Sequence, residues 1–568
     1  MKIEKLTIEK FRAIRLSEIE FSQETALVGQ NSAGKSSILR ALNAFFNFPK
    51  ERKSFDEGRH AFQKTTTSIV TLDFSEVPAS CTLPRIAAGT DKVRARLKFR
   101  KQALWQIYEN GSWISAPSDM HALISENIRY VYIPMKRDHE VSAWGDTGLL
   151  QHVVETWLET HTQKRDRITP KVTDLSNAIQ RQAFNGLSKK LRECTPIKGN
   201  FTYALEYEPS PNYSLFLRDL VLKVIEGDTK VDLEDCGSGT QSLTAFGLYS
   251  YLAELEGSTY VLGIEEPEQN LHPHAQRELI KSLRELPLQV VFTTHSTVMV
   301  DELDHEEVVL CRRVSSSTRG VEVTTKQIKS AFWSGVGFDR ERYYLFHKQR
   351  NSDFFFSSHV VLVESPIDGE VIKHILTEEG IDQSTFAVSI FSVGGVKSLP
   401  YAYKLLKELD MNFSVVVDKD YFVPYLHDER KLSVNQQGFP RYRREFKAGT
   451  LLGDMIPDPA SQADLLGKLH SNHSRAMEAL ADVNVYCFRW AMEVDLVASD
   501  TAEQLLHDHL NVPVADRSKA ELLVNRQKSI KRLEPVLTVL RQLPKKNYPH
   551  SYSRIRKSLS KSIRQTHF

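Results

Sequence analysis

An eight-residue segment near the N-terminus, residues 29–36 (GQNSAGKS), has the glycine, lysine and hydroxyl spacing of a loop that binds the phosphates of ATP. The apolar residues 25–28 precede it, and a pattern with apolar residues on one helical face follows from Ser37, so the loop should join a strand to a helix. Backbone N–H groups at the helix start would surround the phosphates, Lys35 would reach the terminal phosphates, and Ser36 would ligate Mg²⁺. We therefore expect these residues to contact the nucleotide: Gly29, Asn31, Gly34, Lys35, Ser36 and Ser37.

Polar residues that follow two further apolar segments could complete this ATP site. Glu265 and Glu266 end the segment 260–264, and His295 follows the segment 289–293. Glu265 would hold the metal through water, Glu266 would orient or deprotonate the attacking water, and His295 would contact the γ-phosphate. Taken alone, an acidic pair after a strand is common and would be exposed loop charges, and a histidine such as His295 is more often an ordinary loop histidine.

A second set of acidic residues follows two apolar segments in the last third of the chain. Glu364 and Asp368 come after residues 360–363, and Asp418 and Asp420 come after residues 413–417. The carboxyl ends of parallel strands lie along one edge of a sheet, where carboxylates from neighbouring strands can share hard cations such as Mg²⁺, Mn²⁺ or Ca²⁺. Asp418 and Asp420 would face the same side if strand geometry continued. Solvated acids at strand ends are the alternative interpretation of each pair.

The elements that must position these residues are predicted from hydrophobic periodicity. Strand patterns alternate with helical ones, which indicates an α/β protein with a largely parallel, helix-covered sheet. A charged helical pattern from about residue 149 to 194 interrupts the first part. The polar segment 315–358 separates the two groups of strands. We therefore predict one domain over residues 1–350, with a helical insertion at about 145–200, and a second over 357–568.

Composition sets limits on the class of protein. The 568 residues are 41% hydrophobic and 26% charged, which is typical of soluble domains with sizeable cores. The five cysteines form no C-x-x-C pair, and no apolar run approaches the ~20 residues of a membrane span. We therefore expect a cytoplasmic protein with no membrane contact.

The positive charge is concentrated in one part of the chain. The net charge is only +2, but residues 517–568 contain fourteen Lys or Arg and two Glu, a net charge of +12. Such a tail suits a phosphate backbone, although a solvated helical face is an equally good interpretation. The basic segment 441–444 (RYRR) could likewise contact a nucleic-acid backbone, with aromatic stacking, or be a solvated loop.

The turn at residues 237–241 (GSGTQ), directly before a helical pattern, resembles the LSGGQ signature of ABC-type ATPases, from which it departs at its first and fourth positions. The resemblance implies that Ser238, Gly239 and Gln241 contact an ATP held by a second subunit, so that two ATPs lie between two protomers. Residues 5–12 resemble the opening of the RecF and SMC branch, which works on DNA.

The second domain resembles Toprim domains, with an acid after the first strand, a Gly-Gly turn at 394–395 and a D-x-D. It departs from their usual pattern at Ser365-Pro366 and by having aspartate at position 368. An ABC-type ATPase followed by Toprim resembles the OLD (overcoming lysogenization defect) nucleases, including the Gabija nuclease subunit and retron-associated effectors. The resemblance implies two divalent ions held by Glu364, Asp368, Asp418 and Asp420. Further along the chain, Glu493 and Asp495 could extend this site or be charges on a surface helix. The resemblance also implies a late catalytic lysine, for which Lys545 and Lys546 are candidates.

These expectations combine into one leading function and two alternatives. The leading function is an ATP-regulated, Mg²⁺-dependent endonuclease that cuts DNA in prokaryotic anti-phage defence. It would act as a homodimer or a higher homo-oligomer, with or without a separate partner protein. One alternative is a Toprim effector that cleaves RNA, such as tRNA. The other is a non-cleaving, RecF-like DNA-repair ATPase.

Overall fold

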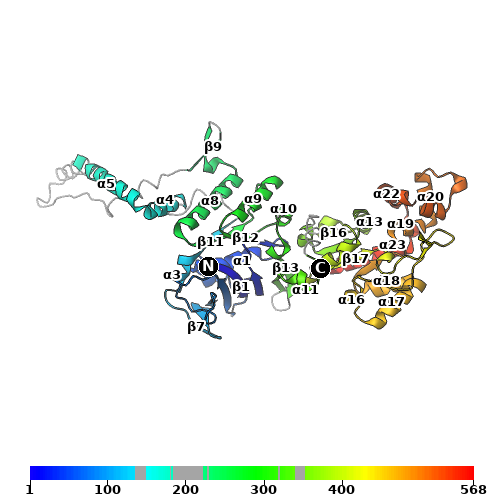
Figure 1. Ribbon diagram of the computed structural model, residues 1–568, viewed down its shortest axis with the longest axis horizontal. Helices are drawn as coiled ribbons and strands as arrows, with labels where there is room; N and C mark the ends of the chain where they lie inside the picture. Colours follow the sequence, from blue (N-terminus) through cyan, green and yellow to red (C-terminus); the bar gives the residue numbers. More distant parts are fainter. Residues whose placement is uncertain are drawn as a thin grey trace. The chain divides into compact units, whose positions relative to one another are not determined.

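The computed structural model describes residues 1–64, 66–134, 149–179, 181–182, 222–226, 229–316, 320–339 and 352–567. These residues form two compact units, which Figure 1 shows as ribbons. The first unit comprises residues 1–27, 32–302 and 311–325, and the second comprises residues 28–31, 303–310 and 326–568. Each unit is described here by itself.

A twelve-stranded sheet dominates the N-terminal part of the chain, in the order β7-β6-β5-β4-β1-β2-β14-β13-β3-β12-β11-β8. Its strands are β1 (Lys2–Phe11), β2 (Ile14–Glu20), β3 (Glu24–Val28), β4 (Ser68–Ser75), β5 (Val93–Phe99), β6 (Ala103–Glu109), β7 (Ser112–Ser115), β8 (Ile128–Ile133), β11 (Thr259–Glu265), β12 (Gln289–Thr293), β13 (Val308–Ser316) and β14 (Gly320–Gln327). The segment 315–358, expected to be a polar separator, instead supplies β14, which pairs in parallel with β2.

The sheet has an antiparallel half and a parallel half. β4, β5, β6 and β7 pair antiparallel beyond β1, and β5 alternates buried and half-buried residues, as expected for a strand with one covered face. β3, β12, β11 and β8 pair in parallel. Every residue of β3 and β12 is buried, which is the pattern of a central strand covered on both faces. The parallel half therefore carries the predicted ATP site.

Several helices accompany this sheet, and α4 and α5 extend away from it (Figure 1). The helices are α1 (Lys35–Phe46), α2 (Phe48–Asp56), α3 (Met120–Asn127), α4 (Leu149–Thr160), α5 (Thr162–Ile179), α8 (Ser238–Glu256), α9 (Pro273–Glu285) and α10 (Thr297–Val300). The expected helical insertion, at about 145–200, includes α4 and α5, and its residues 183–200 lie outside the described residues. A short hairpin of β9 (Lys223–Glu226) and β10 (Thr229–Asp232) leads into α8.

The second unit contains a four-stranded parallel sheet in the order β16-β15-β17-β20. Its strands are β15 (His359–Val363), β16 (Val388–Ser392), β17 (Phe413–Val417) and β20 (Val485–Cys487). β15 is buried at every position, as is typical of a strand covered by helices on both faces. A small hairpin, β18 (His427–Asp428) and β19 (Lys431–Leu432), follows β17.

The helices of the second unit are α11 (Phe332–Gly335), α13 (Pro366–Glu378), α14 (Gln383–Phe386), α15 (Leu399–Glu408), α16 (Leu452–Met455), α17 (Pro459–Ser471), α18 (His473–Ala481), α19 (Met492–Val497), α20 (Asp500–His509), α21 (Gln527–Ile530), α22 (Leu533–Gln542) and α23 (His550–His567). The last of these is amphipathic. Tyr552, Ile555, Leu559 and Ile563, spaced three or four residues apart, are fully buried on one face of α23. This apolar face joins the core that α13, α20 and α22 share, so the basic C-terminal region is an integral part of this unit.

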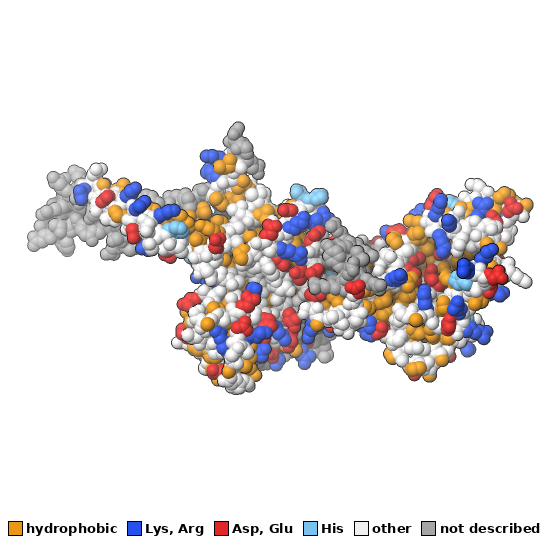
Figure 2. Space-filling view, viewed as in Figure 1, with side chains coloured by type: hydrophobic (Ala, Val, Ile, Leu, Met, Phe, Trp, Pro, Cys, Tyr) orange, Lys and Arg blue, Asp and Glu red, His pale blue; other side chains and the backbone are white. Residues whose placement is uncertain are grey.

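Charged side chains of both signs are interspersed on the face of the molecule shown in Figure 2, in keeping with the small net charge. Within the described residues, no helix combines the length and apolar character that crossing a membrane requires.

Candidate nucleotide and metal sites

The phosphate loop has the backbone conformation that its glycines predict. Gly29 and Gly34 have φ angles of 133° and 89°, and Ser32 has a φ of 61°. Gly34 is the N-cap of α1 in the left-handed region, and a Cβ there would lie 2.8 Å from the side chain of Val323. Glycine is therefore required at position 34 both by conformation and by space. The N-terminus of α1 is the kind of place where helix N–H groups bind an anion.

Lys35 begins α1 and is largely buried, with only 7% of its surface exposed. Burial lowers the pKa of Lys35, while the nearby carboxylates of Glu266 and Glu268 act in the opposite direction. A desolvated ammonium group is costly unless anions approach it. Its position at a helix N-terminus, facing acidic residues, suits a bound triphosphate with its Mg²⁺ ion.

The acidic strand end lies beside the same lysine. β11 ends at Glu265, and Glu266 follows with a φ of 44°. The Glu266 N–H donates to the backbone and hydroxyl oxygens of Thr293, both at 3.1 Å, which fixes this turn against β12. His295 Nε2 lies 3.9 Å from Glu266 Oε1. Burial, with the charge of Lys35 as a second cause, lowers the pKa of His295.

A residue that the sequence analysis did not single out, Glu268, holds these parts together. Its Oε1 accepts hydrogen bonds from the Thr294 hydroxyl and the His295 N–H, both at 2.8 Å. Burial raises the pKa of Glu268, and its Oε2 is buried without a hydrogen-bond partner. The only signal in the sequence was its place in Glu-Glu-Pro-Glu, where three acids follow one strand. Glu268 therefore positions the loop that carries His295.

The predicted signature turn opens α8. Gly237 is the N-cap in an extended conformation, and the helix begins at Ser238, whose side chain lies outside the described residues. The Gln241 side chain donates to the Cys236 carbonyl at 2.9 Å, which closes the turn. A Cβ on Gly239 would lie 2.3 Å from the end of the Leu271 side chain, so a larger residue would require that side chain to move. The contact of this turn with a second subunit's ATP stays a prediction.

The predicted metal ligands of the second unit lie at the carboxyl ends of β15 and β17. The two strands pair in parallel, with Leu362 opposite Val415, which brings Glu364 next to Asp418. The Asp418 N–H donates to Glu364 Oε1 at 3.3 Å. The Gly-Gly turn supports this geometry, because the Gly395 N–H donates to the Glu364 carbonyl at 2.9 Å.

The strand does not continue through the D-x-D. β17 ends at Val417, and Asp418 is instead the N-cap of a 3-10 turn, Lys419–Tyr421. Strand alternation therefore does not place Asp418 and Asp420 on one side, contrary to the expectation, because the strand ends before Asp418. The two carboxylates are nevertheless close enough for the charge of Asp420 to raise the pKa of Asp418.

Five carboxylates influence one another at this edge. Burial raises the pKa of Glu364 to about 7, with the charge of Asp420 as the next cause. Burial also raises the pKa of Asp418, and the charges of Glu364, Asp368 and Glu493 add to the effect. The pKa values of Asp368 and Asp420 are raised mainly by burial. Such a cluster of partly buried acids is stable in its ionised form only with a cation among them.

The carboxylates are not already arranged as a ligand shell. In the described part of the chain, no three His, Cys, Asp or Glu side chains form a ready-made metal site. Instead, Asp368 accepts the Ser365 N–H and hydroxyl, both at 2.9 Å, as the N-terminal cap of α13. Asp418 Oδ1 accepts the Met492 N–H at 3.0 Å. These hard oxygen donors suit Mg²⁺, Mn²⁺ or Ca²⁺, and Glu364, Asp418 and Asp420 are the residues that would hold such an ion.

Comparisons with known families and proteins agree with this division into two activities. Residues 1–109 and 136–300 match an AAA ATPase domain family, and residues 355–420 match the Overcoming lysogenization defect protein-like TOPRIM domain. The Old nuclease of Escherichia phage P2 is 22% identical over 475 residues, covering 76% of this chain and 79% of that protein. The chain thus combines an ATPase domain with an OLD-like TOPRIM domain and is similar to this nuclease over three quarters of its length.

Two further proteins show the same extent of similarity. The OLD nuclease of Thermus scotoductus is 21% identical, covering 74% of this chain and 82% of that protein. The uncharacterized protein YbjD of Escherichia coli strain K12 is 23% identical, covering 74% of this chain and 80% of that protein.

Among solved structures, an SMC head bound to the C-winged helix domain of ScpA aligns with 58% of this chain and 99% of its own, with 16% identity and a TM-score of 0.37.

Glu493 and Asp495 have different environments. Glu493 raises the pKa of Asp418 and Asp368, which places it beside the acidic cluster. Asp495 is buried with 1% exposure, and its two oxygens accept the N–H groups of Arg489 at 2.7 Å and Trp490 at 2.9 Å. Glu493 is therefore a candidate ligand, whereas Asp495 holds the turn before α19.

The structure places the predicted catalytic lysines away from the acids. Lys545 Nζ donates to the Glu378 carbonyl and lies 3.6 Å from Glu379, at the C-terminal end of α13. Asp368 is in the first turn of the same helix, about 16 Å away at 1.5 Å per residue. Lys546 belongs to the same short turn, Lys545–Asn547. The geometry therefore corrects the expectation for both lysines, because the C-terminal region packs against the far end of α13.

Two other lysines lie near the acids instead. Lys531 Nζ is 3.3 Å from Glu493, and Lys447 Nζ donates to the Asp420 carbonyl at 3.3 Å. The charges of both lysines lower the pKa of Asp420, against the effect of burial. No sequence motif marks either residue, because tertiary packing brings them to this edge.

The basic segment 441–444 belongs to a folded loop beside the cluster. The Leu426 N–H donates to the Arg441 carbonyl, and the Tyr425 and Tyr442 rings stack with centroids 5.1 Å apart. The charges of Asp420 and Asp418 raise the pKa of both tyrosines, in addition to burial. The loop is therefore folded beside the acidic edge through its tyrosines, while Arg441, Arg443 and Arg444 are exposed, and its contact with a substrate stays a prediction.

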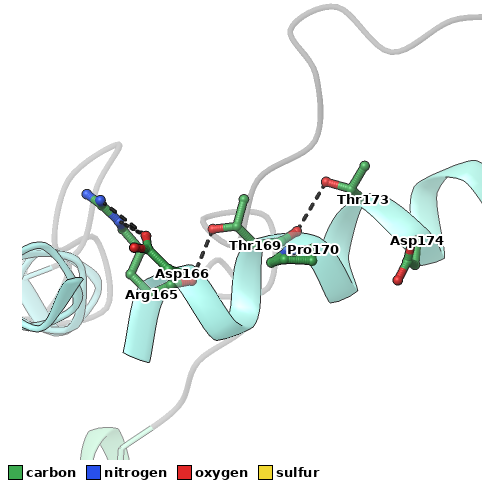
Figure 3. Close-up of a pocket in the computed structure, with 6 residues that line it drawn as sticks. All are labelled: Arg165, Asp166, Thr169, Pro170, Thr173 and Asp174. Carbon is green, nitrogen blue, oxygen red and sulfur yellow. Dashed lines mark hydrogen bonds and ion pairs between the residues drawn. The ribbon is translucent and has the colours of Figure 1, made fainter. Parts of the chain in front are cut away.

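A hollow elsewhere on the molecule carries no comparable chemistry. Figure 3 shows that the side chains lining it, Arg165, Asp166, Thr169, Pro170, Thr173 and Asp174, all come from successive turns of α5. Arg165 is paired with Asp166 at 3.3 Å, and the two threonine hydroxyls donate to carbonyls of their own helix. No polar groups from different elements converge there.

Proposed function

We propose that this protein is a divalent-metal-dependent endonuclease that cuts DNA under the control of ATP. The proposal rests on one observation: Glu364 and Asp418 lie at adjacent parallel strand ends and are joined by a hydrogen bond, and the charge of Asp420, two residues further on, raises the pKa of both. Buried acids that destabilise one another in this way are expected where a cation is bound. The nuclease relatives support phosphodiester hydrolysis as the reaction.

Each residue has a role that follows from its position. Glu364, Asp418 and Asp420 would hold the ions, and Asp368 and Glu493 would complete or orient the ligand set. Bound divalent ions supply an activated water and stabilise the leaving oxygen of a phosphodiester. Lys531, which reaches Glu493 from α21's C-terminal end, would place a positive charge near the scissile phosphate. The ammonium of Lys447, beside Asp420, would aid binding of the same strand.

The ATP site would regulate this chemistry through a dimer. Lys35, Ser36 and the N-terminus of α1 would hold ATP, while Glu266 and His295 would act at the γ-phosphate. We propose that two copies of the chain close on two ATPs through the turn before α8. Exposed apolar residues on one face of α5 support self-association, with Ile168 37%, Leu175 48% and Ile179 39% exposed.

The dimer is testable by mass. Leu175→Glu should shift the oligomer to a smaller species in sedimentation equilibrium, because the substitution puts a charge into the apolar face. Thr173→Glu, on an adjacent exposed position of the same helix, is the matched control and should leave the mass unchanged. A monomer for the wild type with and without ATP would contradict the dimer.

The nuclease activity is tested by plasmid nicking. Wild-type protein should nick supercoiled DNA with Mg²⁺ or Mn²⁺, and Asp418→Ala should reduce the rate by at least about 100-fold. Glu408→Ala, which removes an exposed acid at the end of α15, should cut like the wild type. Equal cutting by wild type and Asp418→Ala would disprove the assignment. Parallel reactions with tRNA would show whether RNA is the preferred substrate.

We also propose, from the family resemblance, a role in cytoplasmic anti-phage defence. Cells that express the wild type should form fewer plaques on phage challenge than cells that express Asp418→Ala. Equal plaque numbers over a panel of phages would argue against defence without affecting the nuclease proposal.

A further inference from the structure

A basic groove lies on the second unit, away from the acidic strand ends. It has a volume of about 460 Å³ and is lined by residues of α23 and by the residue that caps the C-terminal end of α13: Glu379, Lys557, Ser560, Lys561, Arg564 and Gln565. The three basic residues on α23 are spaced by four and three positions, so they share one face of that helix. Nothing in the proposed ATP or nuclease chemistry uses this face.

The charges around the groove are unevenly balanced. Arg564 Nη2 donates to the Glu379 carbonyl at 2.6 Å, which fixes the guanidinium at the groove. The Glu379 carboxylate is contacted by Arg556 at 3.3 Å and by Lys545 at 3.6 Å. Lys557 and Lys561 are exposed. Even with Glu378 and Glu379 counted, the five cations leave a net charge of +3 at this place.

A buried hydroxyl in the groove gives an independent indication of a ligand. Ser560 is only 4% exposed, and its Oγ has no hydrogen-bond partner. A serine within a helix usually donates to the carbonyl four residues earlier. A buried hydroxyl without a partner destabilises the fold, and it has no evident structural benefit here. A phosphate oxygen in the groove would accept that hydrogen bond.

We propose that this groove binds the phosphate backbone of the nucleic acid that the protein cuts. The residues lining the groove include no aromatic side chain, which favours a backbone phosphate over a free nucleotide, whose base would need a stacking surface. The stripe from Lys557 to Arg564 extends about 10 Å, enough to meet more than one phosphate of a strand. This inference deepens the proposed function, because it names a second contact for the same substrate.

The position of the groove sets the length of nucleic acid required. Asp368, in the first turn of α13 at the acidic edge, and Glu379, which caps the C-terminal end of α13 at the groove, are about 16 Å apart. With a rise of about 3.4 Å per base pair, a duplex must extend at least about five base pairs beyond the cut to reach both places. Very short substrates should therefore gain nothing from the groove.

The test measures binding without cutting. Full-length Asp418→Asn protein, without divalent ions, is titrated onto a labelled 30-base-pair duplex, and the same background carries Lys557→Ala with Lys561→Ala. We expect at least about tenfold weaker binding at low salt, and a salt-dependence slope smaller by about 1.8. Lys373→Ala with Lys407→Ala removes the same charge from exposed helix positions of the same unit and should change the affinity less than twofold.

A second variant tests whether weaker binding could result from unfolding alone. Ser560→Ala should weaken duplex binding several-fold while leaving the melting temperature unchanged or slightly higher, because it removes an unpartnered buried hydroxyl. Binding by the Lys557 and Lys561 variant that equals the control pair would overturn the inference. The inference would also be overturned if the Lys557 and Lys561 variant, made in a Lys35→Ala background, bound the duplex normally but lost affinity for inorganic phosphate or ATP. Because this binding assay requires no cleavage, a failure of the nuclease proposal would be seen separately, in the plasmid-nicking assay.

Discussion

The backbone N–H of Asp418 donates a hydrogen bond to Glu364 Oε1 at 3.3 Å, which joins two strand ends that are 54 residues apart in the chain. This contact turns two separate acidic segments into one site. It also keeps the Glu364 carboxylate in place while its pKa is raised to about 7, so the group is poised to lose its proton when a cation arrives.

Metal binding should depend on pH around neutrality. Because a divalent ion binds the ionised carboxylate and the pKa of Glu364 is about 7, the Kd for Mg²⁺ should rise about tenfold between pH 8 and pH 6. Calorimetric titration at the two pH values measures this change. In Glu364→Gln the pH dependence should largely disappear, whereas Glu408→Gln should keep it. A Kd that is the same at both pH values in the wild type would contradict the prediction.

The same pKa predicts how stability changes without metal. The folded pKa of Glu364 is above its ordinary value of 4.5, so the native state binds more protons between about pH 4.5 and 7. The contribution to stability is therefore present at low pH and is lost as the pH rises through about 7. Thermal melts in a chelator should show this fall, of order 1 kcal/mol, and added Mg²⁺ should reverse it at pH 8. An unchanged melting curve from pH 5 to pH 8 would argue against the raised pKa.

Removing Lys35 should abolish ATP binding without unfolding the protein. Burial lowers the pKa of Lys35, which means that the buried charge is unfavourable before an anion binds. Lys35→Ala should therefore melt at the same or a higher temperature than the wild type, but ATP should no longer raise that temperature. Lys53→Ala, an exposed lysine of α2, serves as the control. An ATP-induced shift that persists in Lys35→Ala would place the nucleotide elsewhere.

Glu268 should matter through its hydrogen bonds and not through its charge. Glu268→Gln keeps an acceptor for Thr294 and His295, so its ATPase rate should stay within about threefold of the wild type. Glu268→Ala loses both bonds, worth roughly 1 kcal/mol each, and should lower the rate by at least about tenfold through the displaced His295 loop. Steady-state hydrolysis measures both. Equal losses in the two variants would instead indicate that the negative charge is required.

Two lysine variants distinguish the structure from the sequence expectation. Lys531→Ala should reduce DNA cleavage by about 10²–10³-fold, because it removes a positive charge beside the acidic cluster. Lys546→Ala, on the turn at the far end of α13, should leave the cleavage rate per bound substrate nearly unchanged. Single-turnover cleavage at saturating protein compares them. The opposite ranking would return the catalytic role to Lys546.

The local parts of this protein could be predicted from the chain itself. The residues of the phosphate loop are consecutive, so their backbone conformation depends on glycines at fixed positions and on the helix that follows, and it is found as expected at Gly34. Apolar runs followed by acids predict strand ends at an edge of a sheet, which holds for Glu265 and Glu364. The α/β class follows from the same periodicity.

Tertiary structure decided which side chains meet across long separations. Lys531 and Lys447 approach the acids because α21 and the loop before α16 fold back to this edge, and no spacing rule contains that information. The phase of α19 places Glu493 toward the cluster and Asp495 into the core, although the two residues are only two apart. Likewise, Lys545 belongs to the far end of α13 because the apolar face of α23 docks there. Periodicity specifies which residues share a face, but only packing specifies what that face meets.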